Sequence, residues 1–175
     1  MRVLSIDVGL KNLGFCCLSQ GATPSIIDWD VISVTDLNTK KAKLEDLTPE
    51  LLEALREQFD DSYEADLVLI ENQPMLKNGM IKTISVVIYT YFNMMKMQFG
   101  NIKQVRFVSA TNKLRCKRAT TQQSTSYKDR KDQAIALARL YTTELFPDRI
   151  KWFDSLKKKD DASDSLLYAL HYLGL

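Results

Sequence analysis

Histidine is scarce in this sequence, with His171 as its single example. The usual zinc sites combine several cysteine and histidine ligands, and Ser-His or Cys-His hydrolases need an imidazole base. The composition therefore argues against these classes and favours chemistry based on carboxylates, lysines or a metal ion. Cysteine is sparse too, at three residues, and Cys16-Cys17 lies in an apolar stretch. We expect buried thiols in a reducing compartment.

Long apolar runs, glycine and proline are also in short supply. With six glycines and four prolines the chain is neither collagen-like nor of low complexity, and 45% hydrophobic with 26% charged residues is typical of a globular protein with a core. No run approaches the roughly 18–20 apolar residues of a membrane span, and the N-terminus lacks a signal-peptide pattern. We therefore expect one domain, residues 1–175, in an intracellular protein of the cytoplasm or nucleus that is not secreted and has no membrane partner.

Charge is unevenly distributed, although the formal net charge is only +2. Residues 41–66 contain nine acids and three bases, whereas residues 101–131 contain nine bases and one acid, Asp129. A charge run can simply be a solvated face of the protein. A segment this basic in a nearly neutral chain exceeds what solubility requires and suits a polyanionic partner.

The pattern of apolar residues predicts an α/β domain with a mixed five-stranded sheet. Residues 1–35 alternate apolar runs with short turns and predict three antiparallel strands. Residues 66–71 and 104–108 are short, continuous apolar runs of the kind found in buried parallel strands. Apolar spacings of three and four predict helices at 48–59, 80–99, 128–143 and 160–173. The resulting order is βββαβαβαα, with helices flanking the sheet.

The first helix is expected to start at Thr48. A hydroxyl N-cap there would be followed by Pro49 at the first helical position and by Glu50 in the first turn. Leu51, Leu52, Leu55 and Phe59 would then lie on its inner face. The helix from Met80 to Phe99 is apolar on more than one face, which predicts either a central core helix or a subunit contact.

Two acids follow buried strands. Asp7 comes after Val3-Leu4-Ser5-Ile6 and Glu71 after Leu67-Val68-Leu69-Ile70. An ionised carboxylate beside a core strand is costly to desolvate unless it is paired, and open α/β sheets bind ligands at the carboxyl ends of their strands. Asp161 and Asp164 stand three residues apart at the start of the last helix. Compensation of the helix dipole would explain Asp160 or Asp161 but explains Asp164 less well.

Four carboxylates without histidine partners favour a hard cation. Oxygen ligands prefer Mg²⁺ or Mn²⁺ to zinc. Two such ions roughly 3.5–4 Å apart can activate water and stabilise the leaving oxygen of a phosphodiester. The basic segment would supply the phosphate contacts, so the residues alone suggest metal-dependent phosphoryl chemistry.

Three motifs resemble those of the RNase H-like, RuvC-type Holliday junction resolvases. They are IDVGLKNLG at 6–14, LIENQP at 69–74 and DASDSL at 161–166. The second motif together with Asn78 and Lys82, and the block YKDRKD at 127–132, look most like the resolvases of large DNA viruses such as poxviruses. Motif order and spacing agree over nearly the whole chain. D-x-G alone also opens actin-like ATPases, but these need two such domains.

The resemblance implies an RNase H-like fold and a set of functional residues. Asp7, Glu71, Asp161 and Asp164 would hold two Mg²⁺ ions, with Mn²⁺ able to substitute. Lys113 falls where the family places a lysine near the scissile phosphate, and Lys131 falls at a second basic position. The DNA-binding residues expected from the basic segment are Lys113, Arg115, Lys117, Arg118, Lys128, Arg130 and Lys131. A homodimer with its interface on the helix from Met80 to Phe99 is also implied.

The expected activity is metal-dependent resolution of four-way DNA junctions by paired symmetric hydrolysis, leaving ligatable 5′-phosphate and 3′-hydroxyl ends. Such an enzyme would process recombination and replication intermediates, including concatemers. Two active sites related by a two-fold axis would match the symmetry of the junction. One alternative is another RNase H-like nuclease that acts on flaps or RNA–DNA hybrids. Another is a non-catalytic relative that binds junctions or RNA.

Overall fold

The computed structural model describes residues 1–39, 41–73, 79–109, 116 and 126–175. It has a mixed five-stranded sheet, as predicted, and the strands lie in the order β3-β2-β1-β4-β5. The strands are β1 (Arg2–Asp7), β2 (Asn12–Ser19), β3 (Ser25–Ser33), β4 (Ala65–Asn72) and β5 (Ile102–Ser109). The helices are α1 (Leu44–Gln58), α2 (Gly79–Phe99), α3 (Tyr127–Leu145), α4 (Ile150–Ser155) and α5 (Asp160–Leu173), and a 3-10 turn, Pro147–Arg149, precedes α4.

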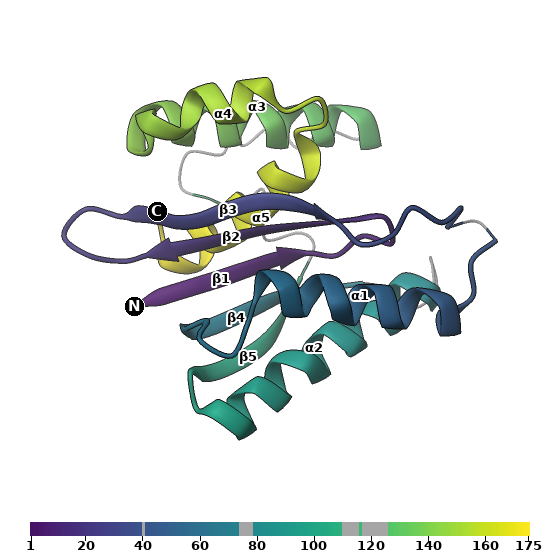
Figure 1. The fold of residues 1–175 in the computed structure, drawn as a ribbon. Helices are drawn as coiled ribbons and strands as arrows, with labels where there is room; N and C mark the ends of the chain where they lie inside the picture. The colour runs from purple at the N-terminus through teal and green to yellow at the C-terminus, as the bar shows by residue number, and fades with distance from the viewer. Residues whose placement is uncertain (40, 74–78, 110–115, 117–125) are drawn as a thin grey trace.

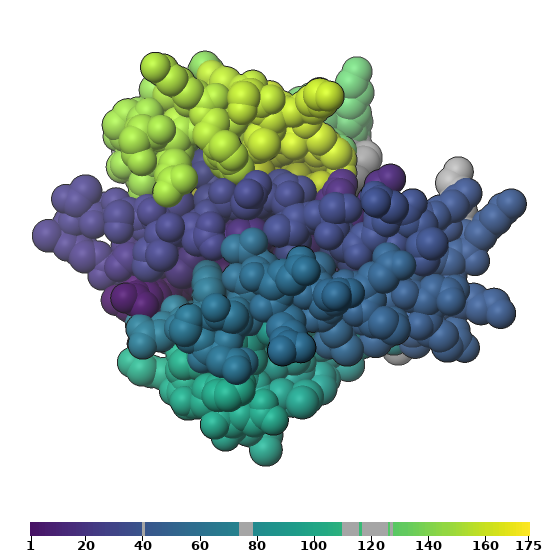
Figure 2. Space-filling view, viewed as in Figure 1, coloured from purple at the N-terminus to yellow at the C-terminus, as the bar shows by residue number. Residues whose placement is uncertain are grey.

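The sheet lies between two helical layers. Helices α1 and α2 cover one face, and α3, α4 and α5 lie on the other (Figure 1). The space-filling view shows the same order, with the green and yellow C-terminal helices above the purple and blue strands and the teal α2 below (Figure 2). The two faces of the sheet therefore belong to two separate cores.

Strand directions place two strand ends at one edge of the sheet. β1 pairs antiparallel with β2 across a short loop and parallel with β4, while β4 pairs parallel with β5. Parallel neighbours need a crossover, which α2 provides between β4 and β5. The carboxyl ends of β1 and β4 therefore lie side by side.

Alternation along each strand decides which core a side chain enters. On β1, Leu4 and Ile6 pack with α1 and α2, whereas Val3 packs with α3 and α5. The adjacent Cys16 and Cys17 divide in the same way, Cys16 toward α5 and Cys17 toward α1 and α2. All three cysteines are buried free thiols, as expected.

The prediction for the start of α1 was wrong. The helix begins at Leu44, and Pro49 lies inside it. The Asp46 carboxylate accepts a hydrogen bond from the Lys43 backbone N–H at 3.1 Å and so caps the helix a full turn earlier. Leu47 is buried together with Leu51 and Leu55, and this packing extends the helix despite the proline. Leu52, expected inside, is exposed.

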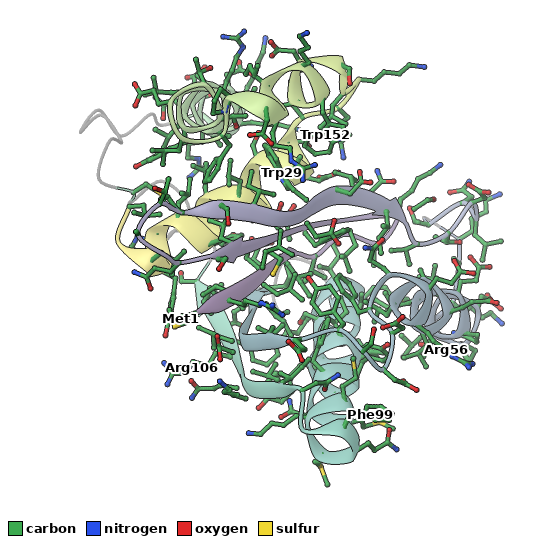
Figure 3. All side chains as sticks on the ribbon, turned by 60° about the vertical axis from the view of Figure 1, so that its left-hand side comes forward. Met1, Trp29, Arg56, Phe99, Arg106 and Trp152 are labelled. Carbon is green, nitrogen blue, oxygen red and sulfur yellow. The ribbon has the colours of Figure 1, made fainter. Side chains whose placement is uncertain are left out.

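A short helix, α4, was not predicted. It carries Trp152 and Phe153, whose rings lie 4.6 and 5.4 Å from that of Trp29. Figure 3 shows Trp29 and Trp152 next to each other between the sheet and the helices above it. Phe153 is buried in the core, and the partly buried Trp152 packs against it. This aromatic cluster packs beside the start of α5, which carries two of the acids.

Candidate active site

Asp7 and Glu71 lie beside each other at the edge of the sheet. Asp7 ends β1, and Glu71 follows the paired residues Ile6 and Ile70 of β1 and β4. Both share their strand face with residues that pack against α5, such as Val3 and Leu69. Glu71 is only 6% exposed. The local alternation therefore turns both carboxylates toward the helix that bears the other two acids.

A glycine allows that helix to approach the sheet. Gly14 on β2 pairs with Asp7 on β1. A Cβ atom at Gly14 would lie 2.2 Å from the backbone O and 3.2 Å from the Cβ of Asp161. Because any larger residue would collide with the first turn of α5, Gly14 permits the contact that brings Asp161 next to Asp7.

Two hydrogen-bonding contacts fasten α5 in this position. The Ser5 hydroxyl donates to the Ser165 carbonyl O at 2.5 Å and lies 3.1 Å from the carbonyl O of Cys16. The Trp29 indole donates to the Ala162 carbonyl O at 3.0 Å. Ala162 and Ser165 flank Asp164 on the helix. These contacts, made from β1 and β3, set the height and rotation of the acid-bearing turns.

Tyr168 lies one turn after Asp164 on α5, and its hydroxyl is buried near the acids. Burial raises the pKa of its phenol far above the ordinary value, and the negative charges of Glu71, Asp7 and Asp164 raise it further. The negative charges of three of the four predicted carboxylates therefore act on this one buried hydroxyl. The three acids therefore lie in the neighbourhood of Tyr168, on the side of the sheet that α5 covers.

The Gln73 amide links the two strand ends. Its Nε2 donates to Glu71 Oε2 at 2.6 Å and to the Val8 carbonyl O at 3.4 Å. Val8 directly follows Asp7. The amide therefore touches the carboxylate at the end of β4 and the backbone just beyond the end of β1.

Lysines engage the acids at the start of α5. Lys158 Nζ lies 2.8 Å from Asp161 Oδ2 and 3.5 Å from Asp160 Oδ2, and Lys131 Nζ lies 2.5 Å from Asp160 Oδ2. Burial acts to raise the pKa of Asp160, but the hydrogen bond from Lys131 and the charge of Lys158 outweigh it and lower the pKa. Lys131, predicted as a phosphate contact, thus approaches the site through Asp160.

The donor set fits a hard divalent cation. All four predicted ligands offer carboxylate oxygens, and a cationic ammonium already rests on Asp161. Within the described part of the chain, no three acidic, histidine or cysteine side chains are close enough to hold a metal ion as they stand. The Asp161 carboxylate is directed to Lys158 instead. Ligation by Asp7, Glu71, Asp161 and Asp164 therefore stays a prediction.

The basic residues divide into two groups. Lys128 and Arg130 are exposed on the first turn of α3, next to Lys131, whose ion pair with Asp160 joins this turn to α5. The start of α3 therefore presents positive charge beside the acids. The remaining predicted DNA contacts lie outside the described residues: Lys113, Arg115, Lys117 and Arg118.

The fold is that of the RuvC-like resolvases. The structure is similar to the fowlpox virus resolvase in complex with Holliday junction DNA, with a TM-score of 0.67 and 18% identity over 99% of this chain and 95% of that chain. It is also similar to Thermus thermophilus RuvC, with a TM-score of 0.57 and 14% identity over 99% and 94%. Identities this low show the fold alone, and they confirm the predicted RNase H-like class.

The sequence matches the family of the poxvirus A22 protein over residues 1–175, and the chain belongs to that family. It is also 33% identical over 119 residues to the uncharacterized protein L451 of Acanthamoeba polyphaga mimivirus. That alignment covers 61% of this chain and 28% of the mimivirus protein, so the chain spans less than a third of this relative. The resemblance to viral resolvases inferred from three short motifs is confirmed at the level of the family.

Helix α2 carries exposed apolar residues on its outer side. Val86, Met94 and Met97 are exposed, Met97 to 84%, and their spacing puts them on one side of the helix. Its inner side packs Ile84, Ile88 and Phe92 into the core. None of the helices in the described residues is long and apolar enough to span a membrane.

Sequence reasoning missed four contributors to the site: Gly14, Gln73, Lys158 and Tyr168. Gly14 and Gln73 stood inside the quoted motifs, but only packing reveals what they touch. Lys158 belongs to a run of three lysines that reads equally well as a solvated loop. Tyr168 lies four residues after Asp164 on the same helix, so helical spacing could have placed it near the acids.

Proposed function

We propose that this protein is a metal-dependent endonuclease that resolves four-way DNA junctions. The observation that carries the proposal is that Asp7 and Glu71 stand at neighbouring strand ends on the sheet face covered by α5, the helix that bears Asp161 and Asp164. Asp161 lies against Gly14 at the same edge, and the basic first turn of α3 is adjacent. Membership of the A22 family and a fold shared with proteins named as Holliday junction resolvases support the choice of substrate.

In this proposal the four carboxylates hold two Mg²⁺ ions, and Mn²⁺ can replace them. Bound Mg²⁺ supplies the positive charge that activates water and stabilises the leaving oxygen of a phosphodiester. The chain's own contribution is to hold four negative charges in a largely buried site and to present Lys128 and Arg130 to the DNA backbone. Hydrolysis would leave 5′-phosphate and 3′-hydroxyl ends that a ligase can join.

Paired cleavage needs two sites, so we also propose a homodimer. Its interface would be the exposed apolar side of α2, because Val86, Met94 and Met97 would otherwise face water. A two-fold axis would set two sites on opposed strands of a junction. Sedimentation should show a dimer for the wild type and a monomer for Met94→Glu. A matched control, Leu140→Glu on the exposed side of α3, should remain dimeric.

The cellular role follows from the substrate. A junction resolvase would act on recombination and replication intermediates, including concatemers, wherever that DNA is copied in the cytoplasm or nucleus. RNA–DNA hybrids or flaps are the substrates of the alternative nuclease on the same fold. Pure binding of junctions or RNA is the alternative without catalysis.

The test is a cleavage panel with one purified preparation. It compares a four-way junction, a flap, a linear duplex and an RNA–DNA hybrid, each in Mg²⁺ and in EDTA. Paired symmetric nicks on the junction, lost in EDTA, are expected. Preferred cutting of flaps or hybrids would select the alternative nuclease. Tight junction binding without cleavage in any divalent ion would select the binding protein.

Asp7→Asn tests the acids in the same assay. Because the substitution removes one negative charge with little change of shape, it should abolish cleavage while junction binding persists. Retained cleavage would remove Asp7 from the site. Raised salt should weaken binding by the wild type, since lysine and arginine contacts to phosphates release counterions. A salt-insensitive affinity would contradict the role of the basic segment.

A further inference from the structure

We propose that Gln73 is a positioning residue that orients the Glu71 carboxylate for metal binding. This inference rests on the proposed function, because it assigns Glu71 as a ligand. It adds a residue that touches neither the metal nor the DNA and acts through its hydrogen bonds. Its basis is the pair of contacts that the Gln73 amide makes at the edge of the sheet.

The amide group can make both contacts at once. A glutamine NH₂ carries two N–H donors. One points to Glu71 Oε2 at 2.6 Å, a short hydrogen bond of the charge-assisted kind, and the other to the Val8 carbonyl O at 3.4 Å. The longer contact anchors the amide to the backbone next to Asp7. The shorter one then holds Glu71 relative to that backbone.

This bridge lies where the sheet no longer fixes the geometry. The recorded pairing of β1 with β4 ends at Ile6 and Ile70, whereas β4 continues alongside β5 as far as Asn72. Glu71 therefore stands just beyond the last β1–β4 pair, and its side chain has three rotatable bonds. Gln73 supplies the cross-link between the two strands at that point.

Neutrality suits Gln73 to this role. A lysine or arginine at this place would neutralise Glu71 and compete with a cation. The amide orients the carboxylate and leaves its negative charge available. Hydrogen bonds of this kind to ligating carboxylates fix their orientation, and their loss typically lowers metal affinity or activity by roughly 10–100-fold.

The neighbouring amide, that of Asn72, does not face the site. Asn72 points to the opposite face of the sheet, where its Oδ1 accepts a hydrogen bond from Lys82 Nζ at 2.7 Å. Lys82 also lies 4.6 Å from the centre of the Phe107 ring. Of these two consecutive amides, Gln73 is the one directed at the site, as strand alternation requires.

The test compares Gln73→Met with a matched control, Gln58→Met. The amide of Gln58, on α1, also donates to a carboxylate, Oδ2 of Asp28 at 3.0 Å. Asp28 lies on β3, away from the site. Each variant loses one amide–carboxylate hydrogen bond and keeps nearly the same side-chain volume. The readouts are Mn²⁺ affinity by calorimetry, junction affinity in EDTA, thermal unfolding, and single-turnover cleavage over a range of Mg²⁺ concentrations.

We expect Gln73→Met to weaken Mn²⁺ binding by roughly 10–100-fold while junction affinity in EDTA stays at the wild-type value. Cleavage should fall at low Mg²⁺ and recover in part at high Mg²⁺, which a purely structural defect would not do. Gln58→Met should leave Mn²⁺ affinity, junction affinity and the Mg²⁺ dependence of cleavage unchanged. If Gln73→Met does not unfold cooperatively, Gln73→Asn replaces it, since it keeps the amide but is one methylene too short to bridge both acceptors.

Wild-type Mn²⁺ affinity in the Gln73 variant would overturn the proposal. An equal loss of Mn²⁺ affinity in Gln73→Met and Gln58→Met would also overturn it. Failure of the proposed function looks different, because the wild-type protein itself would then neither bind Mn²⁺ nor cut a junction. A wild type that cleaves, beside a Gln73 variant with the same Mg²⁺ dependence, rejects only the role of Gln73.

Discussion

The two faces of one sheet both pack apolar side chains, but they differ in how many polar contacts they make with their helices. Toward α1 and α2, the strands present large apolar groups that meet an aromatic cluster, in which the rings of Phe15 and Phe92 lie 5.1 and 5.3 Å from that of Phe59. Toward α5 the strands also carry large apolar side chains, such as Val3, Trp29 and Leu69, but small and polar residues stand among them. Three buried polar residues lie on this side: Ser5 on β1, Glu71 on β4 and Ser165 on α5.

The difference follows from what each face must do. Bulky side chains separate a helix from a sheet and gain stability by burying apolar area. The acids of α5 must instead come within reach of Asp7 and Glu71, which requires close backbone approach at Gly14 and hydrogen bonds such as that of Ser5. Both faces thus supply apolar packing, and the face toward α5 adds the contacts that position the acids.

Adjacent residues on β1 offer the largest contrast. Leu4→Ala opens a cavity in the face toward α1 and α2 and should lower the free energy of unfolding by about 2–5 kcal/mol. Ser5→Ala removes a hydroxyl from the other face and should lower it by about 1 kcal/mol. Urea unfolding measures both values. Single-turnover cleavage should be measured at a temperature where both variants are folded. Ser5→Ala should then cleave more slowly than Leu4→Ala, although it is the more stable variant. If the less stable variant is also the slower one, the distinction between the two faces is wrong.

Gly14→Ala tests the close approach directly. The new Cβ would meet the backbone of Asp161, so the helix must shift, and overpacking of this kind costs about 1–3 kcal/mol. Cleavage should drop by much more than the stability loss explains, because Asp161 moves away from Asp7. The control is Gly79→Ala, where no atom lies within 4 Å of the new Cβ and neither stability nor cleavage should fall. Equal behaviour of the two variants would show that α5 does not need this contact.

The smallest predicted effect concerns the two adjacent thiols, and here the faces should behave alike. Burial raises the pKa of both Cys16 and Cys17. Below the unfolded pKa of about 8.5 the thiol is protonated in both states, so stability is independent of pH. Above it the unfolded thiol ionises first, and stability falls as pH rises toward the folded pKa.

Urea unfolding at pH 7 and pH 9 measures this loss. Cys16→Ala and Cys17→Ala should each reduce it, by less than about 1 kcal/mol and by similar amounts, since burial and not the choice of face sets the shift. If the loss of stability between pH 7 and pH 9 becomes smaller in only one of the two variants, the two faces also differ in how they shield ionisable groups.

The sequence by itself determined the strands, the existence of four of the helices, and which strands and helix carry the predicted acids. These follow from local patterns: strand alternation and short apolar runs, helical spacing in 80–99 and 160–173, and an acid directly after each of two buried strands. α5 has the predicted bounds, because Asp160 begins and Leu173 ends a clear apolar periodicity. The family resemblance was equally readable, since its motifs are contiguous.

Tertiary structure alone decided how the acids are brought together. Gly14 with Asp161, Ser5 with Ser165 and Trp29 with Ala162 are pairs separated by more than a hundred residues, and no local pattern encodes them. The early start of α1 has a mixed origin, because the local cap by Asp46 and the burial of Leu47 together outweigh the local signal of Pro49. Local propensities amount to fractions of a kcal/mol per residue, whereas burying one large side chain contributes roughly 1.5–3 kcal/mol, so packing sets the final geometry wherever the two conflict.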